Sequence, residues 1–229
     1  MTLPELQAEL GYPKSSIYVL ARTLVQHGWL ETDPTGSLYG LGLRALLVGT
    51  SYIDRDETVA LSRETLRWLV GELNETVHLA RLDGSDVVYL ATRESKHDLR
   101  AFTRVGRRLP AHATSLGKSL LAERSDPELS ALLPPTLTAL TPKTLVDPVA
   151  LRGDLELTRT RGYAVDHEEN TIGVSCYGVA LRTRTPAVDA VSCSVPVARL
   201  DPGREKEIVA ALLTARGRIE QIIRDLRPR

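Results

Sequence analysis

Five residues between positions 14 and 22 carry groups that bind nucleic acid, at spacings that a helix would bring to one side. They are Lys14, Ser15, Ser16, Tyr18 and Arg22. Hydroxyl, phenol and guanidinium groups can hydrogen-bond base edges in the major groove, and a lysine ammonium group binds phosphate as a point charge. The segment therefore predicts a DNA-reading helix, with Lys14 on the phosphate backbone and the other four residues nearer the bases.

A second set of reactive residue types lies further along the chain. Cys176, His112 and Asp166 could form the nucleophile, the base and the orienting carboxylate of a cysteine hydrolase. The sequence does not place the three side chains near one another. The simpler interpretation makes His112 a hydrogen-bonded structural histidine and Cys176 a small buried residue. We keep the hydrolase as an alternative and expect no enzyme.

The two cysteines also limit metal and redox chemistry. Cys176 and Cys193 are too few for a disulfide framework. Together with His112 and His167 they lack the spacing of a zinc site. We therefore expect reduced thiols, no metal ion and no cofactor.

The DNA-contacting residues need a supporting helix before them and a ribbon after them. Thr2-Leu3-Pro4-Glu5 has the form of a capping box, and Gly11 suits the end of a short helix. A second helix is predicted from Lys14 to His27, where apolar residues recur at intervals of three and four. This predicted buried face consists of Ile17, Leu20, Ala21, Leu24 and Val25. Residues 29–32 and 37–41 are predicted to be two strands, which completes a winged helix-turn-helix.

Charge argues against strong DNA binding by a single copy of this segment. Residues 1–44 hold three basic and four acidic side chains. A neutral domain binds phosphates weakly, whereas two copies that present paired helices to a palindromic site gain in effective concentration. An ordinary helical hairpin packed on a β-ribbon, without nucleic acid, is the alternative.

The remainder of the chain predicts an α+β domain, because helices alternate with antiparallel strands. An apolar stretch over 43–52 leads to a helix capped at Asp54, whose apolar stripe either contacts a second copy or packs on its own domain. The stripe consists of Val59, Leu66, Leu69, Val70 and Leu73. Strands are predicted at 76–82, 87–92, 100–103, 163–165, 174–182 and 188–197. Further helices are predicted at 116–122, 126–133, 147–161 and from 201 onward. The inward face of the last helix consists of Ile208, Leu212, Ile219, Ile222 and Leu226.

Composition narrows the class of protein. The formal net charge is zero, so the chain as a whole is not a general binder of polyanions. It contains no run of eighteen apolar residues and no basic segment followed by an apolar signal core. We expect a cytoplasmic protein with no membrane partner.

Several longer stretches resemble one family of bacterial regulators. They are Pro13-Lys14-Ser15-Ser16, Leu24-Val25-Gln26-His27-Gly28-Trp29-Leu30, Glu75-Thr76-Val77-His78-Leu79, Gly106-Arg107-Arg108-Leu109-Pro110-Ala111-His112-Ala113-Thr114-Ser115-Leu116-Gly117-Lys118 and Arg161-Gly162-Tyr163-Ala164-Val165-Asp166-His167-Glu168-Glu169-Asn170. In content and order they are similar to the isocitrate-lyase-regulator (IclR) type of transcriptional regulator.

The resemblance implies a winged helix-turn-helix DNA-binding domain over 1–42, a linker helix over 43–56 and a GAF-like effector-binding domain over 57–229. It also implies a homodimer or a dimer of dimers (a homotetramer) that binds double-stranded operator DNA. A small-molecule effector, such as an organic acid or an aromatic or sugar-derived metabolite, would sit in a cup of the sheet. By motif position the cup is lined by Ser115, Leu116, Asp166, Cys176, Ser192 and Ser194.

The chemistry of the cup residues fits an effector with more than a bare carboxyl group. Backbone N–H groups at the start of the Leu116 helix favour a carboxylate, and the hydroxyls of Ser192 and Ser194 lie two residues apart on one strand face. The Asp166 carboxylate would repel an anion unless donors lie between them. The basic stretch around Arg104, Arg107 and Arg108 is either a solvated or interface loop or an anion clamp.

One departure from the family concerns the beginning of the chain. Relatives carry a further helix before the residues that match Leu3 onward, and Met1 leaves no room for it. Either the start codon is placed too far downstream, or the DNA-binding domain is incomplete. We expect a ligand-responsive repressor of transcription; a metabolite-binding module without DNA activity is the alternative if Met1 is the true start.

Overall fold

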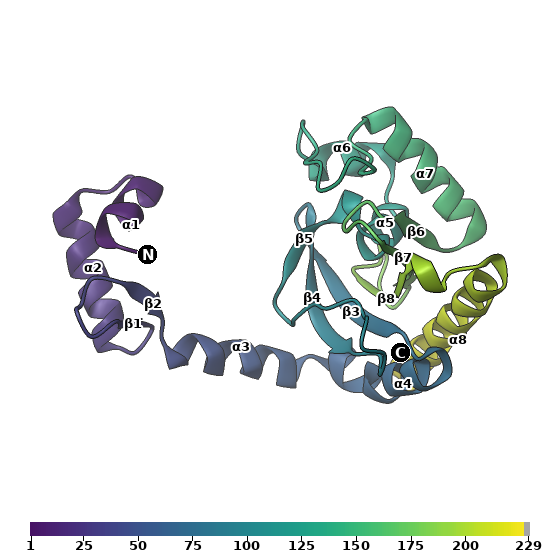
Figure 1. The fold of residues 1–229 in the computed structure, drawn as a ribbon, viewed down its shortest axis with the longest axis horizontal. Coiled ribbons are helices and arrows are strands. Elements are labelled where there is room, and N and C mark those ends of the chain that lie inside the picture. Colours follow the sequence, from purple (N-terminus) through teal and green to yellow (C-terminus); the bar gives the residue numbers. More distant parts are fainter. Residues whose placement is uncertain (227–229) are drawn as a thin grey trace. The chain divides into compact units, whose positions relative to one another are not determined.

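The computed structural model describes residues 1–226, which form two compact units. The first runs from Met1 to Asp56 and the second begins at Glu57 (Figure 1).

The first unit contains the predicted helices and ribbon. Helix α1 (Leu3–Leu10) begins at a capping box between Thr2 and Glu5 and ends at Gly11, whose φ of 69° is left-handed. Helix α2 (Lys14–Gln26) follows, and strand β1 (Leu30–Thr32) pairs antiparallel with β2 (Tyr39–Leu41). Helix α3 (Leu43–Arg55) ends the unit. The predicted helix-turn-helix with its two-stranded wing is therefore confirmed.

Two details of the prediction for this region are wrong. Leu20, which the period predicts on the buried face of α2, is 50% exposed, whereas Ile17 and Ala21 are buried. Asp54 was expected to cap a helix, but it lies inside α3, and the next helix, α4 (Glu57–Leu73), begins after Asp56. Asp56 is extended, which separates the two helices.

A six-stranded antiparallel sheet organises the second unit, in the order β5-β4-β3-β8-β7-β6. Its strands are β3 (Thr76–Asp83), β4 (Asp86–Arg93), β5 (Arg108–Pro110), β6 (Ala164–His167), β7 (Val174–Leu181) and β8 (Asp189–Pro196). Strand β8, one of the two central strands, is buried along its whole length. The sheet thus joins the β3–β4 hairpin to β8, whose residues lie more than a hundred positions from their partners on β3.

Helices cover both faces of this sheet (Figure 1). On one face α4 and α8 (Pro202–Leu226) pack together and against the strands. On the other face α5 (Ser115–Leu121) lies across β7 and β8, with α7 (Pro148–Arg161) packed against α5. The short helix α6 (Asp126–Leu132) precedes α7. The α+β class is therefore confirmed.

The structure corrects two further expectations here. Residues 100–103 form no strand; β5 takes the edge beside β4 instead. In α8 the buried residues are Ile208, Leu212, Ala215, Ile219 and Ile223. Their spacing of four, three, four and four residues keeps them on one face of the helix. Ile222 lies beside this face and is half-buried, and Leu226 is exposed.

Candidate functional site

One cavity lies on the α5 face of the sheet. The space between its walls is about 570 Å³, open solvent at its mouth included. All six residues predicted for the effector cup line it: Ser115, Leu116, Asp166, Cys176, Ser192 and Ser194. The fold therefore brings together residues that lie up to 79 positions apart in the sequence.

Strand register explains how these residues meet. The first row across the sheet is Asp166 on β6, Cys176 on β7 and Ser194 on β8. Ser192 lies two residues before Ser194 and therefore shares its face. It stands opposite Gly178 on β7 and His78 on β3, which form the next row. The side chains of β8 that alternate with these serines point to the α4 and α8 face.

Glycine lets α5 approach the sheet closely at this point. A Cβ atom on Gly178 would lie 2.6 Å from the Ser115 carbonyl oxygen, closer than real side chains come. The first turn of α5 is capped by Thr114, whose hydroxyl accepts a hydrogen bond from the Gly117 N–H at 3.0 Å. Ser115 and Leu116 are thereby held at the wall of the cavity.

Asp166 is the acidic group of the cavity. It is 1% exposed, and its Oδ1 accepts backbone N–H bonds from Glu169 at 2.6 Å and Asn170 at 3.3 Å. Burial raises the pKa of Asp166 to about 7, although the bond from the Glu169 N–H acts in the opposite direction. Near neutral pH the carboxylic acid form is therefore present, and it can donate a hydrogen bond.

The charge of Lys118 lowers the pKa of Asp166, but Lys118 has its own carboxylate partners. Lys118 is buried, and its Nζ lies 2.6 Å from Glu169 Oε1 and 2.9 Å from Asp154 Oδ2. These two ion pairs occupy the ammonium group. The network fixes the segment after β6, whose backbone in turn holds Asp166.

The geometry does not assemble the cysteine hydrolase considered from the sequence. Burial raises the pKa of the Cys176 thiol well above its usual range, and its Sγ lies 3.1 Å from Ser194 Oγ. A protonated thiol is a poor nucleophile. His112 does not line the cavity, and its Nε2 lies 3.0 Å from the Thr138 carbonyl oxygen, as a structural histidine would.

The six predicted cup residues leave out eleven others that line the cavity, among them His78, Tyr89 and Thr103. Arg107 is also among them, and it belongs to the stretch predicted to be either a loop or an anion clamp. The rings of His78 and Tyr89 meet edge to face at 5.2 Å, and burial lowers the pKa of His78 to about 3. A β-bulge opposite Leu79 and Ala80 shifts the alternation of β4, so that Tyr89 and Thr92 share the cavity face. His78 and Arg107 lie in the stretches that carry the family resemblance, so the resemblance is the sequence feature that could have identified them as cavity residues.

The basic stretch before β5 divides into residues with different surroundings. Arg108 forms ion pairs with Asp83 and Asp86. Arg107 is exposed at the cavity wall, and in the part of the chain that is described it has no ion pair. Arg104 lies on the same loop but does not line this cavity.

Thr103 also lines the cavity, and its hydroxyl group is free to form a hydrogen bond. Its side chain is buried, and its hydroxyl has no hydrogen-bond partner within residues 1–226. A buried hydroxyl without a partner is unfavourable unless a ligand or a water molecule bonds to it.

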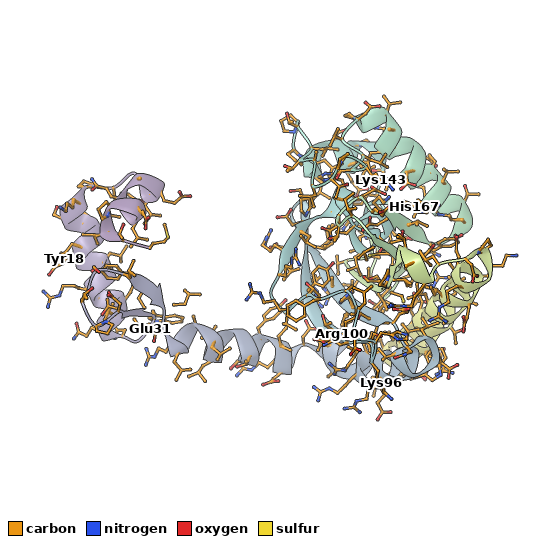
Figure 2. The ribbon with its side chains drawn as sticks, viewed as in Figure 1. Tyr18, Glu31, Lys96, Arg100, Lys143 and His167 are labelled. Carbon is orange, nitrogen blue, oxygen red and sulfur yellow. The ribbon has the colours of Figure 1, made fainter. Side chains whose placement is uncertain are left out.

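The residues predicted to contact DNA are exposed on α2: Lys14, Ser15, Ser16, Tyr18 and Arg22. Tyr18 projects from the helix into solvent (Figure 2), and the Arg22 guanidinium lies 5.8 Å from the centre of its ring. Ile17 and Ala21, on the other side of α2, are 2% and 3% exposed. The helix therefore has one buried side and one side free for a partner.

Comparison with known proteins identifies the two units. Residues 1–34 match the IclR helix-turn-helix domain, and residues 50–221 match the C-terminal domain of the bacterial transcriptional regulator IclR. The chain belongs to the IclR family. The transcriptional repressor IclR of Escherichia coli is 34% identical over 220 residues, which cover 94% of this chain and 80% of the relative.

Solved structures support the same assignment. A putative IclR transcriptional regulator from Silicibacter matches with a TM-score of 0.85 at 26% identity, covering 97% of this chain and 89% of its own. An IclR homologue from Microbacterium hydrocarbonoxydans, complexed with 4-hydroxybenzoate, matches with a TM-score of 0.79 at 23% identity. The match covers 98% of this chain and 92% of the homologue, and it shows likeness of fold.

The IclR-family protein is thus a DNA-binding transcriptional regulator with a helix-turn-helix domain followed by an effector-binding domain. Its homologues are transcriptional regulators rather than enzymes. Among residues 1–226 no helix is long and apolar enough to cross a membrane. The same residues contain no group of three or more His, Cys, Asp or Glu side chains that could hold a metal ion.

Proposed function

We propose that this regulator senses a small organic acid or a related metabolite in the cavity between α5 and the sheet. The observation that supports this proposal is that the six predicted cup residues line one cavity: Ser115, Leu116, Asp166, Cys176, Ser192 and Ser194. Its interior offers hydroxyl donors and neutral groups, so it can bind a polar ligand without burying an unpaired charge.

The effector would use both ends of the cavity. Arg107 supplies the positive charge at the exposed wall, where a carboxylate can remain partly solvated. Asp166 in its acid form donates to a second polar group of the ligand, and the hydroxyls of Ser192 and Ser194 add hydrogen bonds. An acid with a further oxygen function, such as the 4-hydroxybenzoate of the Microbacterium homologue, has this arrangement of groups.

Operator reading is assigned to α2. Ser15, Ser16, Tyr18 and Arg22 would contact bases or nearby backbone, and Lys14 would contact phosphate. Their exposure on one side of a helix whose other side is buried supports this assignment.

We also propose the arrangement in which the two functions are coupled. The winged domain spans residues 1–42, α3 is the linker helix within 43–56, and the effector domain spans 57–229. The protein acts in the cytoplasm as a repressor, like the relatives whose names say so, and as a homodimer or a dimer of dimers. Effector binding would change the spacing of paired winged domains and hence operator affinity.

The test is fluorescence anisotropy on a duplex from the upstream region of the protein's own gene. We expect wild-type protein to bind it, and a panel of small hydroxy- and keto-acids to release it. Arg22→Ala should weaken binding about tenfold or more, since a base contact is worth about 1 to 3 kcal/mol. Unchanged affinity of Arg22→Ala would overturn the α2 assignment. A panel acid that binds Asp166→Ala and Ser194→Ala as tightly as wild type would overturn the cavity assignment.

A further inference from the structure

Three arginines gather on the α4 side of the sheet in the second unit. Arg63 and Arg67 are four residues apart on α4, so they project from the same side of the helix, and both are exposed. Arg93 is the last residue of β4 and stands opposite Val77 of β3. The side chain of Arg93 therefore leaves the sheet on the face that α4 covers.

The three guanidinium groups act on one another as like charges. Partial burial lowers the pKa of Arg93, and the charges of Arg67 and Arg63 lower it further. The Arg93 Nη1 donates to the Thr92 carbonyl oxygen at 2.9 Å, which is a neutral acceptor. The lowered pKa of Arg93 is what like charges produce when Arg63, Arg67 and Arg93 lie on the same side of the sheet.

Some other arginines of the same unit have carboxylate partners, although Arg107, Arg152 and Arg184 have none among the described residues. Arg81 pairs with Asp189, Arg100 with Glu94 and Arg199 with Glu75. Across residues 1–226, Arg63, Arg67 and Arg93 form no such ion pair. Glu64, between the two helix arginines in sequence, lines the groove beside Trp68 and Arg218. The cluster therefore keeps its charge available for an anion from outside the chain.

The distribution of charge along the chain indicates which anion. Residues 1–56 contain four Lys and Arg against six Asp and Glu, so the unit with the base-reading helix has a net charge of about −2. The remaining residues contain 25 basic against 23 acidic side chains, from totals of 29 each. Attraction to the DNA backbone depends on neutralising phosphates, and the first unit has little charge with which to do so.

We propose that Arg63, Arg67 and Arg93, the α4 basic patch, bind phosphate groups of duplex DNA. The contact is independent of sequence and lies outside the base-reading helix. It adds affinity and salt dependence to operator binding, while α2 supplies base selection. The inference rests on the DNA-binding function of the family and not on which residues of α2 contact bases.

The experiment compares Arg63→Ala/Arg67→Ala with wild type by anisotropy on two duplexes at 50 to 300 mM salt. One duplex comes from the gene's own upstream region, and the other has a random sequence. We expect the double variant to bind both duplexes about tenfold more weakly. We also expect it to reduce the slope of log K against log salt by about two, because each lost phosphate contact removes about 0.9.

A matched control removes the same charge elsewhere. Arg152 and Arg184 are exposed on α7 and on the loop before β8, and Arg152→Ala/Arg184→Ala should leave the slope unchanged. Arg63→Lys/Arg67→Lys, which keeps the charge, should restore most of the slope. Thermal melts by circular dichroism check that each variant is folded.

Four outcomes would overturn the proposal. One is an unchanged slope in the folded double alanine variant, and another is an equal loss in the control. The third is failure of wild type to bind the random duplex at 50 mM salt. A fall in oligomer mass by light scattering, with DNA binding per protomer intact, would assign the patch to a second copy of the chain instead.

Discussion

At the scale of single residues, burial sets the chemistry of the cavity. His78 has its pKa lowered to about 3, and the pKa values of Tyr89 and Cys176 are raised, so all three are uncharged at neutral pH. Asp166 differs, because its raised pKa of about 7 lies within the physiological range. The interior can therefore change its charge at one position only among these four groups.

Replacing Asp166 by Asn should change how stability depends on pH. The folded state holds the Asp166 proton up to about pH 7, whereas the unfolded state loses it near the ordinary aspartate pKa of 3.8. Between these values the folded state binds more protons, so this group makes the free energy of unfolding fall as pH rises. The slope is at most about 1.4 kcal/mol per pH unit. Asp166→Asn should remove that slope, as measured by urea unfolding from pH 4.5 to 8.

The comparison isolates Asp166 because the other titrating groups are common to both proteins. The amide keeps an oxygen that can accept from Glu169 N–H and Asn170 N–H. Parallel pH profiles for wild type and variant would mean that Asp166 is ionised in the folded protein.

Arg107 should distinguish carboxylates from their neutral analogues. We expect Arg107→Met to weaken any acid that releases the operator about tenfold or more, and to leave the matching amide unaffected. Arg104→Met is the control, since it lies on the same loop without lining the cavity. Isothermal titration of each acid and amide pair measures both constants. Equal losses for the acid in the two variants would show a general effect of loop charge.

At the scale of elements, the cavity depends on α5 lying directly on β7. The contact is made backbone to backbone, because Gly178 has no side chain and faces the Ser115 carbonyl. The same approach recurs at Gly117, where a Cβ atom would lie 2.2 Å from the Ala111 carbonyl oxygen. Two glycines thus hold the short helix between the sheet and the η1 turn (Ala111–Ala113).

Gly178→Ala should therefore destabilise the effector domain by roughly 2 kcal/mol or more, since backbone must move to admit the methyl group. Gly153→Ala is the matched control, because Gly153 lies inside α7 with open space around it. It should be neutral or stabilise by about 0.5 to 1 kcal/mol. Thermal or urea unfolding measures the stability of both variants against that of the wild type. Similar stabilities for the two would show that α5 can shift without cost.

At the scale of the whole molecule, an IclR-family regulator must link effector binding to DNA binding. Such a link is a coupling free energy between two sites, and it acts equally in both directions. An acid that weakens operator affinity by a given factor should itself bind the DNA complex more weakly by that factor, commonly about 5- to 150-fold.

Two titrations test this reciprocity. Anisotropy gives operator affinity with and without saturating acid, and calorimetry gives acid affinity with and without saturating operator. Agreement of the two factors supports coupling between the cavity and α2. Factors that differ beyond error would indicate that the acid also binds a second place, such as the α4 basic patch.

The sequence by itself determined the local elements and the family. The capping box at Thr2, the left-handed end at Gly11 and the period of α2 are interactions between near neighbours, which local sequence specifies. The six effector cup residues follow from the family resemblance, by motif position. The sequence indicates neither the distances between their side chains nor their protonation states. It also misplaced the edge strand at 100–103, because pairing to β4 depends on contacts outside that segment.

Only the tertiary structure decided which residues line the cavity together and which of them carry a charge. The row of Asp166, Cys176 and Ser194 depends on the register of three strands, and Tyr89 enters through a bulge that breaks simple alternation. Burial then fixed the charge states of His78 and Asp166, and packing gathered the α4 basic patch. Register, burial and like-charge contact are relations between distant parts of the chain, so a reading of local pattern could not supply them.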